Sequence, residues 1–261
     1  MQVIDLVLKS SYPFRTTDRP NGVCFLVVLQ VGNRFVGLAD TLQFVYVLER
    51  HNSVWTRYET TSRCTDLTAK IIISGFVVLD RRSFMVSDAA TFDCLLLNMD
   101  SLEWTIVKAC QWYRYGALFV RSLCIHGFVY TLFDGGILAF ELVVSENDGS
   151  YYLDAPIFLR AWSKIVRERS MICFASVGQD DDDDHSCDHC LVFCLARGGY
   201  PRAGYSSTVR KKLYDDVQIT MIQVMTRETG RGTREPVRPP RYVDVCTNSV
   251  EWMQACWVFV A

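Results

Sequence analysis

The stretch that decides the fold reads Ile71-Ile-Ile-Ser-Gly-Phe-Val-Val-Leu79, and three shorter apolar runs follow it at Ser83–Val86, Asp93–Asn98 and Trp104–Val107. These runs are rich in β-branched and aromatic residues and are separated by turn-forming residues, which is typical of short β-strands. They therefore predict a unit of four antiparallel strands, in a repeat of roughly 40–50 residues.

The same pattern recurs with a period of about 49 residues. Trp55 and Trp104 each follow a turn-like stretch and lie 49 residues apart, and Trp252 lies 148 residues beyond Trp104. The last interval is close to three further steps. Each tryptophan is expected to pack the outer strand of its unit against the next unit.

Five such units predict an all-β fold, a kelch-like β-propeller of about five recognisable four-stranded blades in a complete or incomplete ring. Residues 1–22 form an N-terminal segment that could add an edge strand, and residues 23–261 form the propeller. Two insertions, at 179–189 and 227–241, interrupt the later units. Ile157–Arg169 fits either a short helix or a strand.

Composition narrows the function classes. The chain has 261 residues, of which 50% are hydrophobic, a net charge of −2 and a pI of about 6.1. This balance argues against a chain-wide basic surface for nucleic acid. No apolar stretch reaches the roughly 18 residues that a membrane-spanning helix needs. The N-terminus lacks a signal-peptide pattern, and most of the eleven cysteines sit in apolar runs, so we expect a cytoplasmic or nuclear protein.

Three stretches resemble a known family. Phe128-Val-Tyr-Thr-Leu-Phe-Asp-Gly-Gly136 resembles a kelch repeat. Together with Gly75–Asp88 and Leu95–Trp104, it is similar to the kelch-like propeller region of plant F-box proteins. The resemblance implies a protein-interaction receptor that recognises substrates for a cullin-type ubiquitin ligase. Its partners would be a protein substrate and, if an F-box lies upstream, a Skp1-type adaptor, because residues 1–22 are too short for an F-box.

Other functions stay open beside this one: a ligase-independent kelch-type scaffold, a propeller enzyme or a zinc-binding module. Copper radical oxidases share the propeller, and their chemistry needs two histidines and two tyrosines around one copper. The four histidines here are dispersed, at His51, His126, His185 and His189. We therefore predict no catalytic residue, no cofactor and no enzyme.

A cluster in the first insertion has the spacing of a metal site. Cys187 and Cys190 are arranged as Cys-x-x-Cys, and His185 and His189 could complete a tetrahedral zinc site. The alternative is a solvated acidic loop that leads into a strand. The run Asp180–Asp184 favours that alternative, because consecutive carboxylates repel one another and stay hydrated.

The two insertions also carry the residues predicted to contact a partner. Asp181 and Asp182 lie in the acidic insertion, and Arg231 and Arg234 lie in the basic one. No aromatic platform interleaves the arginines, which argues against nucleic acid. Both insertions fall between the second and third strands of their units. Loops on a rigid scaffold usually carry recognition, so this face is expected to bind the partner. In the regular units it is marked by Asp40, Asp88 and Asp134.

Overall fold

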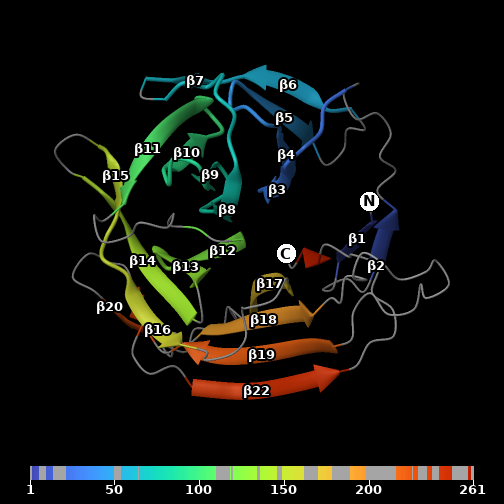
Figure 1. Cartoon of the computed structure of the whole chain (residues 1–261), viewed down its shortest axis with the longest axis vertical. Coiled ribbons are helices and arrows are strands. Elements are labelled where there is room, and N and C mark those ends of the chain that lie inside the picture. Colours follow the sequence, from blue (N-terminus) through green and yellow to red (C-terminus); the bar gives the residue numbers. More distant parts are fainter. Residues whose placement is uncertain are drawn as a thin grey trace, which may run out of the picture.

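A computed structural model describes residues 2–5, 10–13, 22–49, 54–63, 65–109, 118, 120–133, 136–145, 149–161, 170–177, 189–197, 216–224, 226–228, 234–236, 241–248 and 258–259. All the regular elements in these ranges are strands. No helix within them is long and apolar enough to span a membrane. Figure 1 shows the sheets arranged around a common centre.

The first unit is a four-stranded antiparallel sheet in chain order. It contains β3 (Val27–Val31), β4 (Arg34–Leu38), β5 (Phe44–Glu49) and β6 (Thr56–Glu59). The middle strands β4 and β5 are mostly apolar and bury successive residues, so both faces of this sheet are covered. The strand pattern predicted from the sequence is confirmed in this unit.

The second and third units form one closed ring of eight strands, a β-barrel. The second unit is an antiparallel meander, and β12, β13 and β14 of the third unit run antiparallel in turn, with β15 beside β14. The parallel ladders β8–β12 and β11–β15 join the two units at both edges. The ring strands are β8 (Ile73–Val78), β9 (Ser83–Asp88), β10 (Cys94–Asn98), β11 (Glu103–Ala109), β12 (Val120–Ile125), β13 (Phe128–Phe133), β14 (Gly136–Val144) and β15 (Tyr151–Leu153).

Short strands flank the ring. β7 (Thr61–Ser62) pairs with β11, and β16 (Ile157–Ala161) pairs with β14. The sequence left Ile157–Arg169 open between a short helix and a strand, and its first part, Ile157–Ala161, is a strand. β20 (Thr226–Glu228) and β21 (Arg234–Pro236) form a two-stranded sheet.

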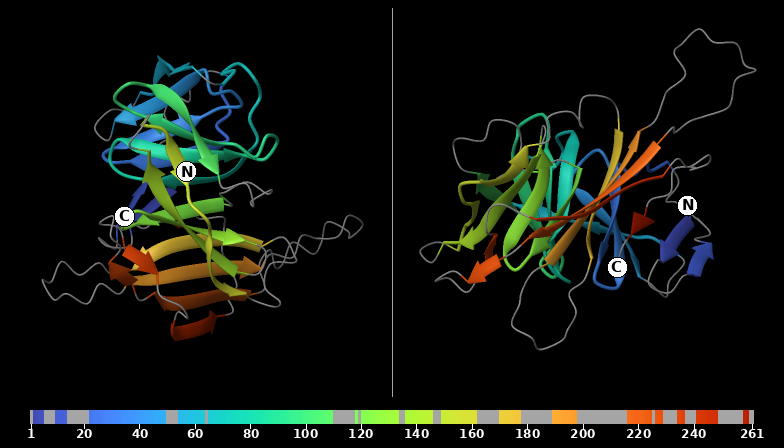
Figure 2. Two further views of the ribbon diagram at one scale, coloured as in Figure 1. Left: turned by 90° about the vertical axis from the view of Figure 1, so that its left-hand side faces the viewer. Right: turned by 90° about the horizontal axis from the view of Figure 1, so that it is seen from below.

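A separate four-stranded antiparallel sheet follows, with the order β17-β18-β19-β22. Its strands are β17 (Ser170–Val177), β18 (His189–Arg197), β19 (Asp216–Val224) and β22 (Arg241–Asn248). β1 (Gln2–Asp5) pairs with β2 (Ser10–Pro13) and, in parallel, with β23 (Val258–Phe259). Figure 2 shows the blue-to-green strands of the first two units apart from the orange and red strands of this later sheet.

The predicted propeller is wrong. A propeller requires separate blades, whereas here the second and third units share backbone ladders at both edges and close into one barrel. The physical reason is that a strand edge carries unpaired N–H and C=O groups, and closing the ring pairs them. This pairing between units leaves no mark on the sequence period.

The described residues form three apolar cores, and two of them hold the first three units together. One is shared by the first and second units and includes Leu29, Val36, Val45, Phe84 and Leu97. The other lies between the second and third units. Sheet faces from successive units therefore pack against one another, which explains why inward positions of these strands are almost all apolar.

The tryptophans do not occupy equivalent environments. Trp104 is fully buried, meets the ring of Phe84 edge-on with centroids 5.7 Å apart, and donates its Nε1–H to the backbone oxygen of Leu42 at 3.2 Å. It thus ties the second unit to the first. Trp55 is half-buried and lies 4.8 Å from the ring of Phe25. Trp252 lies outside the described residues.

Candidate functional site

The predicted metal ligands are only partly within the described residues. His185 and Cys187 lie outside them, and His189 and Cys190 begin β18, where only the backbone is described. Within the part of the chain that the structure describes, no group of three or more His, Cys, Asp or Glu side chains could hold a metal ion. The zinc site stays a prediction.

Most of the residues predicted to contact a partner also lie outside the described residues. Asp181, Asp182 and Arg231 lie outside the described ranges. Arg234 is the first residue of β21, and its partner in the ladder is Glu228. The basic insertion therefore contains a short hairpin, and its contribution to partner binding stays a prediction.

The backbone itself marks a different candidate. Among the residues that the structure describes, three other than glycine have a positive φ: Phe92 at 64°, Leu102 at 56° and His126 at 51°. Histidine tolerates this conformation comparatively well. Leu102 packs its side chain against the first core, which offsets the strain. Phe92 closes the same kind of turn as Leu102, with its N–H bonded to the carbonyl four residues earlier, but it is 47% exposed, so packing in a core does not offset its strain. Such strain in a bulky residue is found most often at functional sites.

The loop that carries Phe92 is held by Asp88, the last residue of β9. Its carboxylate accepts hydrogen bonds from the backbone N–H of Ile72 at 3.0 Å and of Ala90 at 3.0 Å, and from the hydroxyl of Thr91 at 3.0 Å. Its backbone oxygen accepts the N–H of Phe92 at 2.9 Å. Burial alone would raise the pKa of Asp88, but these hydrogen bonds outweigh it and hold the pKa below its usual range.

A second exposed apolar side chain lies beside this loop. Ile72, in the segment that leads into β8, is 61% exposed, and its backbone oxygen accepts the N–H of Ala89. The preceding N–H, of Ile71, donates to the backbone oxygen of Asp40. The structure therefore brings the predicted Asp40 and Asp88 turns to the same short segment. Asp134 lies outside the described residues.

We call this region the Phe92 surface. It combines the two exposed apolar side chains with an exposed small residue and three exposed charged side chains from the neighbouring loops. Its members are Asp40, Lys70, Ile72, Ala90, Phe92 and Asp93.

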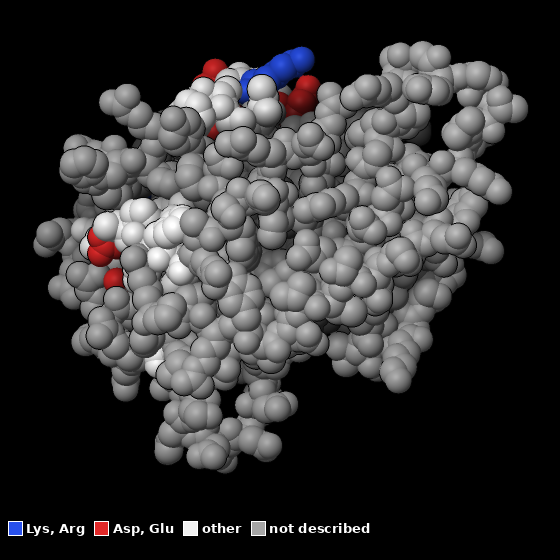
Figure 3. Space-filling view, turned by 60° about the horizontal axis from the view of Figure 1, so that its bottom comes forward, with Lys and Arg blue, Asp and Glu red and all other residues white. Residues whose placement is uncertain are grey.

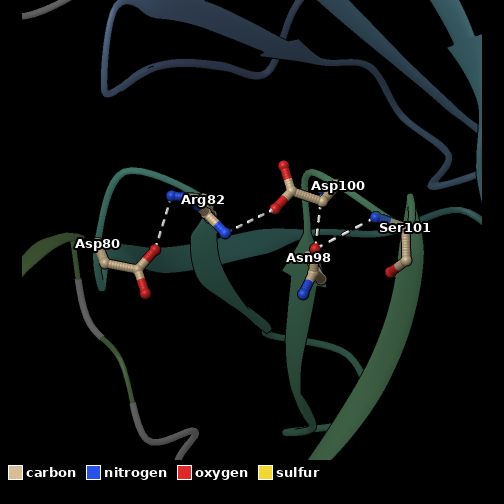
Figure 4. Close-up of polar contacts among 5 residues, drawn as sticks. All are labelled: Asp80, Arg82, Asn98, Asp100 and Ser101. Atoms are coloured by element: carbon tan, nitrogen blue, oxygen red, sulfur yellow. Dashed lines mark hydrogen bonds and ion pairs between the residues drawn. The ribbon is translucent and has the colours of Figure 1, made fainter.

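The opposite ends of the same strands carry a polar cluster, drawn in Figure 4. Asp80 Oδ1 accepts the N–H of Arg82 at 2.6 Å, and Asn98 Oδ1 accepts those of Asp100 and Ser101 at 2.8 and 3.2 Å. An exposed ion pair at 3.5 Å joins Arg82 to Asp100. Exposed pairs of this kind contribute about 0–1 kcal/mol. We interpret the cluster as two turns that stabilise their own hairpins.

Two titratable groups with raised pKa values, the half-buried Cys124 and the buried Tyr130, lie on the β12–β13 hairpin. Burial and the nearby charge of Asp80 raise the pKa of the Cys124 thiol to about 11. Burial, with a smaller effect of Cys124, raises the pKa of Tyr130 above its ordinary value. Both groups therefore stay protonated at neutral pH, and the thiol is not a nucleophile there.

Charged side chains do not gather on the face drawn in Figure 3. The described acidic side chains appear there in two small groups, one of them beside a basic side chain. The other described side chains on that face are uncharged. The Phe92 surface is therefore the candidate site that the described side chains define.

Comparison with known proteins assigns the chain to no family. No family model matches the chain, and no curated protein matches it. It is similar to the crystal structure of a "putative 6-phosphogluconolactonase" from Bacteroides uniformis, with 12% identity and a TM-score of 0.32, over 87% of this chain and 74% of that one. At this level of similarity, the activity of that protein does not transfer to this chain.

These findings correct the functional prediction. No kelch or F-box family model matches, and the second and third units close into one barrel instead of forming separate propeller blades. The prediction of a non-enzymatic receptor or scaffold related to plant F-box proteins is therefore contradicted, and the associated Skp1-type adaptor has no support. The resemblance to F-box proteins rests on the sequence stretches alone.

Proposed function

We propose that this protein recognises a small ligand through the Phe92 surface. The observation that carries the proposal is the conformation of Phe92, a strained backbone that displays an aromatic ring to solvent. A rigid aromatic side chain provides a flat contact area at a small cost in conformational entropy. The hydrogen bonds around Asp88 fix that ring before a ligand arrives, which reduces the cost of binding.

The size of the apolar area favours a small ligand. Phe92 is 47% exposed and Ile72 is 61% exposed. Large side chains present roughly 150–250 Å² each, so the two together offer on the order of 200 Å². A stable protein interface needs about 800 Å² from each partner. The described patch is therefore suited to one ring of a small molecule.

The charged side chains around Ile72 and Phe92 indicate which class of ligand the surface could bind. Asp40 and Asp93 provide acceptors, and Lys70 provides donors, around the apolar pair. A neutral ring with several hydroxyl groups can use both kinds of partner and place its apolar face on Phe92. We therefore expect a hydroxylated ring compound of the saccharide class. A cytoplasmic or nuclear location is part of this proposal, supported by the thiols of Cys24 and Cys124, which are not in disulfides.

The test is ligand-observed NMR with a panel of methyl glycosides. We expect saturation transfer from the wild-type protein to at least one glycoside, and loss of that signal in Phe92→Gly. Glycine adopts the required φ freely, so this variant keeps the loop and removes only the ring. Val54→Ala changes an exposed apolar residue elsewhere and should bind as the wild type does. New product resonances in the same samples would make the ligand a substrate.

Two results would overturn the proposal. One is that no glycoside in the panel receives saturation. The other is that Phe92→Gly binds as well as the wild type. Binding of a phenylalanine-containing peptide in place of every glycoside would assign the surface to a protein partner instead.

A further inference from the structure

Asp88, which holds the loop that carries Phe92, makes hydrogen bonds to more than one segment of the chain. The carboxylate of Asp88 reaches Ile72, sixteen residues away in the chain, and also Ala90 and Thr91 in its own loop. Its backbone oxygen holds the N–H of Phe92. Ile72 and Phe92, the two exposed apolar residues of the Phe92 surface, therefore both donate a backbone hydrogen bond to Asp88.

Other turn-forming side chains in the chain act locally. The carboxylate of Asp66 accepts hydrogen bonds from the N–H and the hydroxyl of Thr68, two residues away, and is also stabilised by the backbone of Ala69, three residues away. Asp80 and Asn98 bind N–H groups two or three residues ahead. Asp88 differs because it joins two separate segments, and it is buried where Asp66 and Asp80 are exposed. Capping of one turn therefore does not account for its contacts.

From this geometry we infer that Asp88 is a positioning residue for recognition: it sets the relative placement of Ile72 and Phe92, and thereby the affinity of the Phe92 surface. The inference rests on the proposed function. Asp88 touches no ligand itself, since its carboxylate oxygens are occupied by Ile72, Ala90 and Thr91. The low pKa of Asp88 agrees with this, because the ionised form accepts all three hydrogen bonds.

The first experiment uses no ligand. Hydrogen exchange at the Ile72 and Ala90 amides is measured in the full-length wild type and in Asp88→Ala. We expect at least about a tenfold faster exchange at both amides in the variant, with the amides of β10 unchanged. Asp66→Ala is the matched control, since it removes an aspartate that holds only a local turn. Unchanged protection of Ile72 in Asp88→Ala would overturn the inference.

The second experiment measures the affinity for the glycoside that binds the wild type. We expect Asp88→Ala to weaken binding about tenfold or more and Asp66→Ala to leave it unchanged. Asp88→Asn should retain most of the affinity, because its side-chain oxygen still accepts the N–H groups of Ile72 and Ala90. If Asp88→Ala does not fold, Thr91→Val removes the hydroxyl that donates to Asp88 and accepts the N–H of Asp93, and it should weaken binding by a smaller factor.

The outcomes separate the two proposals. If Phe92→Gly abolishes binding and Asp88→Ala does not weaken it, the proposed function stands and the positioning role is wrong. If no glycoside binds the wild type, the proposed function fails, and the role of Asp88 in recognition fails with it. Faster exchange at Ile72 would then show a purely structural contact.

Discussion

At the scale of single residues, a positive φ has opposite consequences at Phe92 and Leu102. Relief of strain of about 1–3 kcal/mol outweighs the entropic cost of glycine, so Phe92→Gly should raise the free energy of unfolding by about 1 kcal/mol. Leu102→Gly should lower it, because Leu102 packs against the first core and loses roughly 2 kcal/mol of apolar burial. Urea denaturation of both variants checks this, and a loss of stability in Phe92→Gly would show that the ring packs in the folded state.

Asp88 should make stability depend on pH in a defined direction. Its folded pKa lies below the ordinary value of 3.8, so its contribution to stability is fully present above that value. The contribution is lost as the pH falls through the lower folded pKa. Asp88→Asn should remove it, and the difference in unfolding free energy between wild type and variant should shrink as the pH falls below 3.8. A constant difference from pH 7 to pH 2 would contradict the prediction.

The sequence could identify Asp88 as a landmark but not its contacts. Its place at the end of an apolar run is visible, and the turn after it follows from Ala89-Ala-Thr91 being flanked by two apolar strands. The hydrogen bond to Ile72 depends on how β8 and β9 pair, which no local pattern specifies. The backbone strain at Phe92 is equally invisible, because phenylalanine ordinarily argues against a positive φ.

At the scale of elements, Trp104 links two sheets through one hydrogen bond and a large apolar contact. Trp104→Phe should lower the free energy of unfolding by about 1–3 kcal/mol, since it leaves a buried backbone oxygen of Leu42 with one donor fewer and a small void. Thermal denaturation measures this. Trp55→Phe is the comparison, and it should cost less because that ring is half-buried. Equal losses would contradict the different environments described above.

Strand positions in the first three units were predictable because their apolar runs and turn residues are sharply divided. Ile71–Leu79 contains β8, and Asp93–Asn98 contains β10. The period of about 49 residues was also real at the level of units. The period did not indicate how neighbouring units pair. A parallel ladder such as β8–β12 joins strands that are far apart in the sequence, and it requires no change in the residues of either strand that a sequence pattern could reveal.

At the scale of the whole molecule, the first two units should unfold together. Val45 of the first sheet and Leu97 of the second lie in the same core. Val45→Ala should cost roughly 1–3 kcal/mol and accelerate global exchange of amides in β9 and β10 as well as in β5. Hydrogen exchange with mass spectrometry checks this. Faster exchange confined to β3–β6 would show that the first sheet opens independently of the barrel.

The closed ring also has a consequence for synthesis on the ribosome. β7 pairs with the outer edge of β11 at Glu103 and Trp104, but the far end of that edge, at Lys108 and Ala109, obtains its neighbour only when Tyr151–Leu153 has been made, whereas β3–β6 are complete by residue 59. During the interval, this end of β11, and the edge of β8 until β12 has been made, are available to any other extended chain, including the neighbouring nascent chains on one messenger RNA. Slow elongation after β11 would prolong that interval, so codon choice between residues 110 and 150 should influence the yield of native protein more than codon choice in the first sheet.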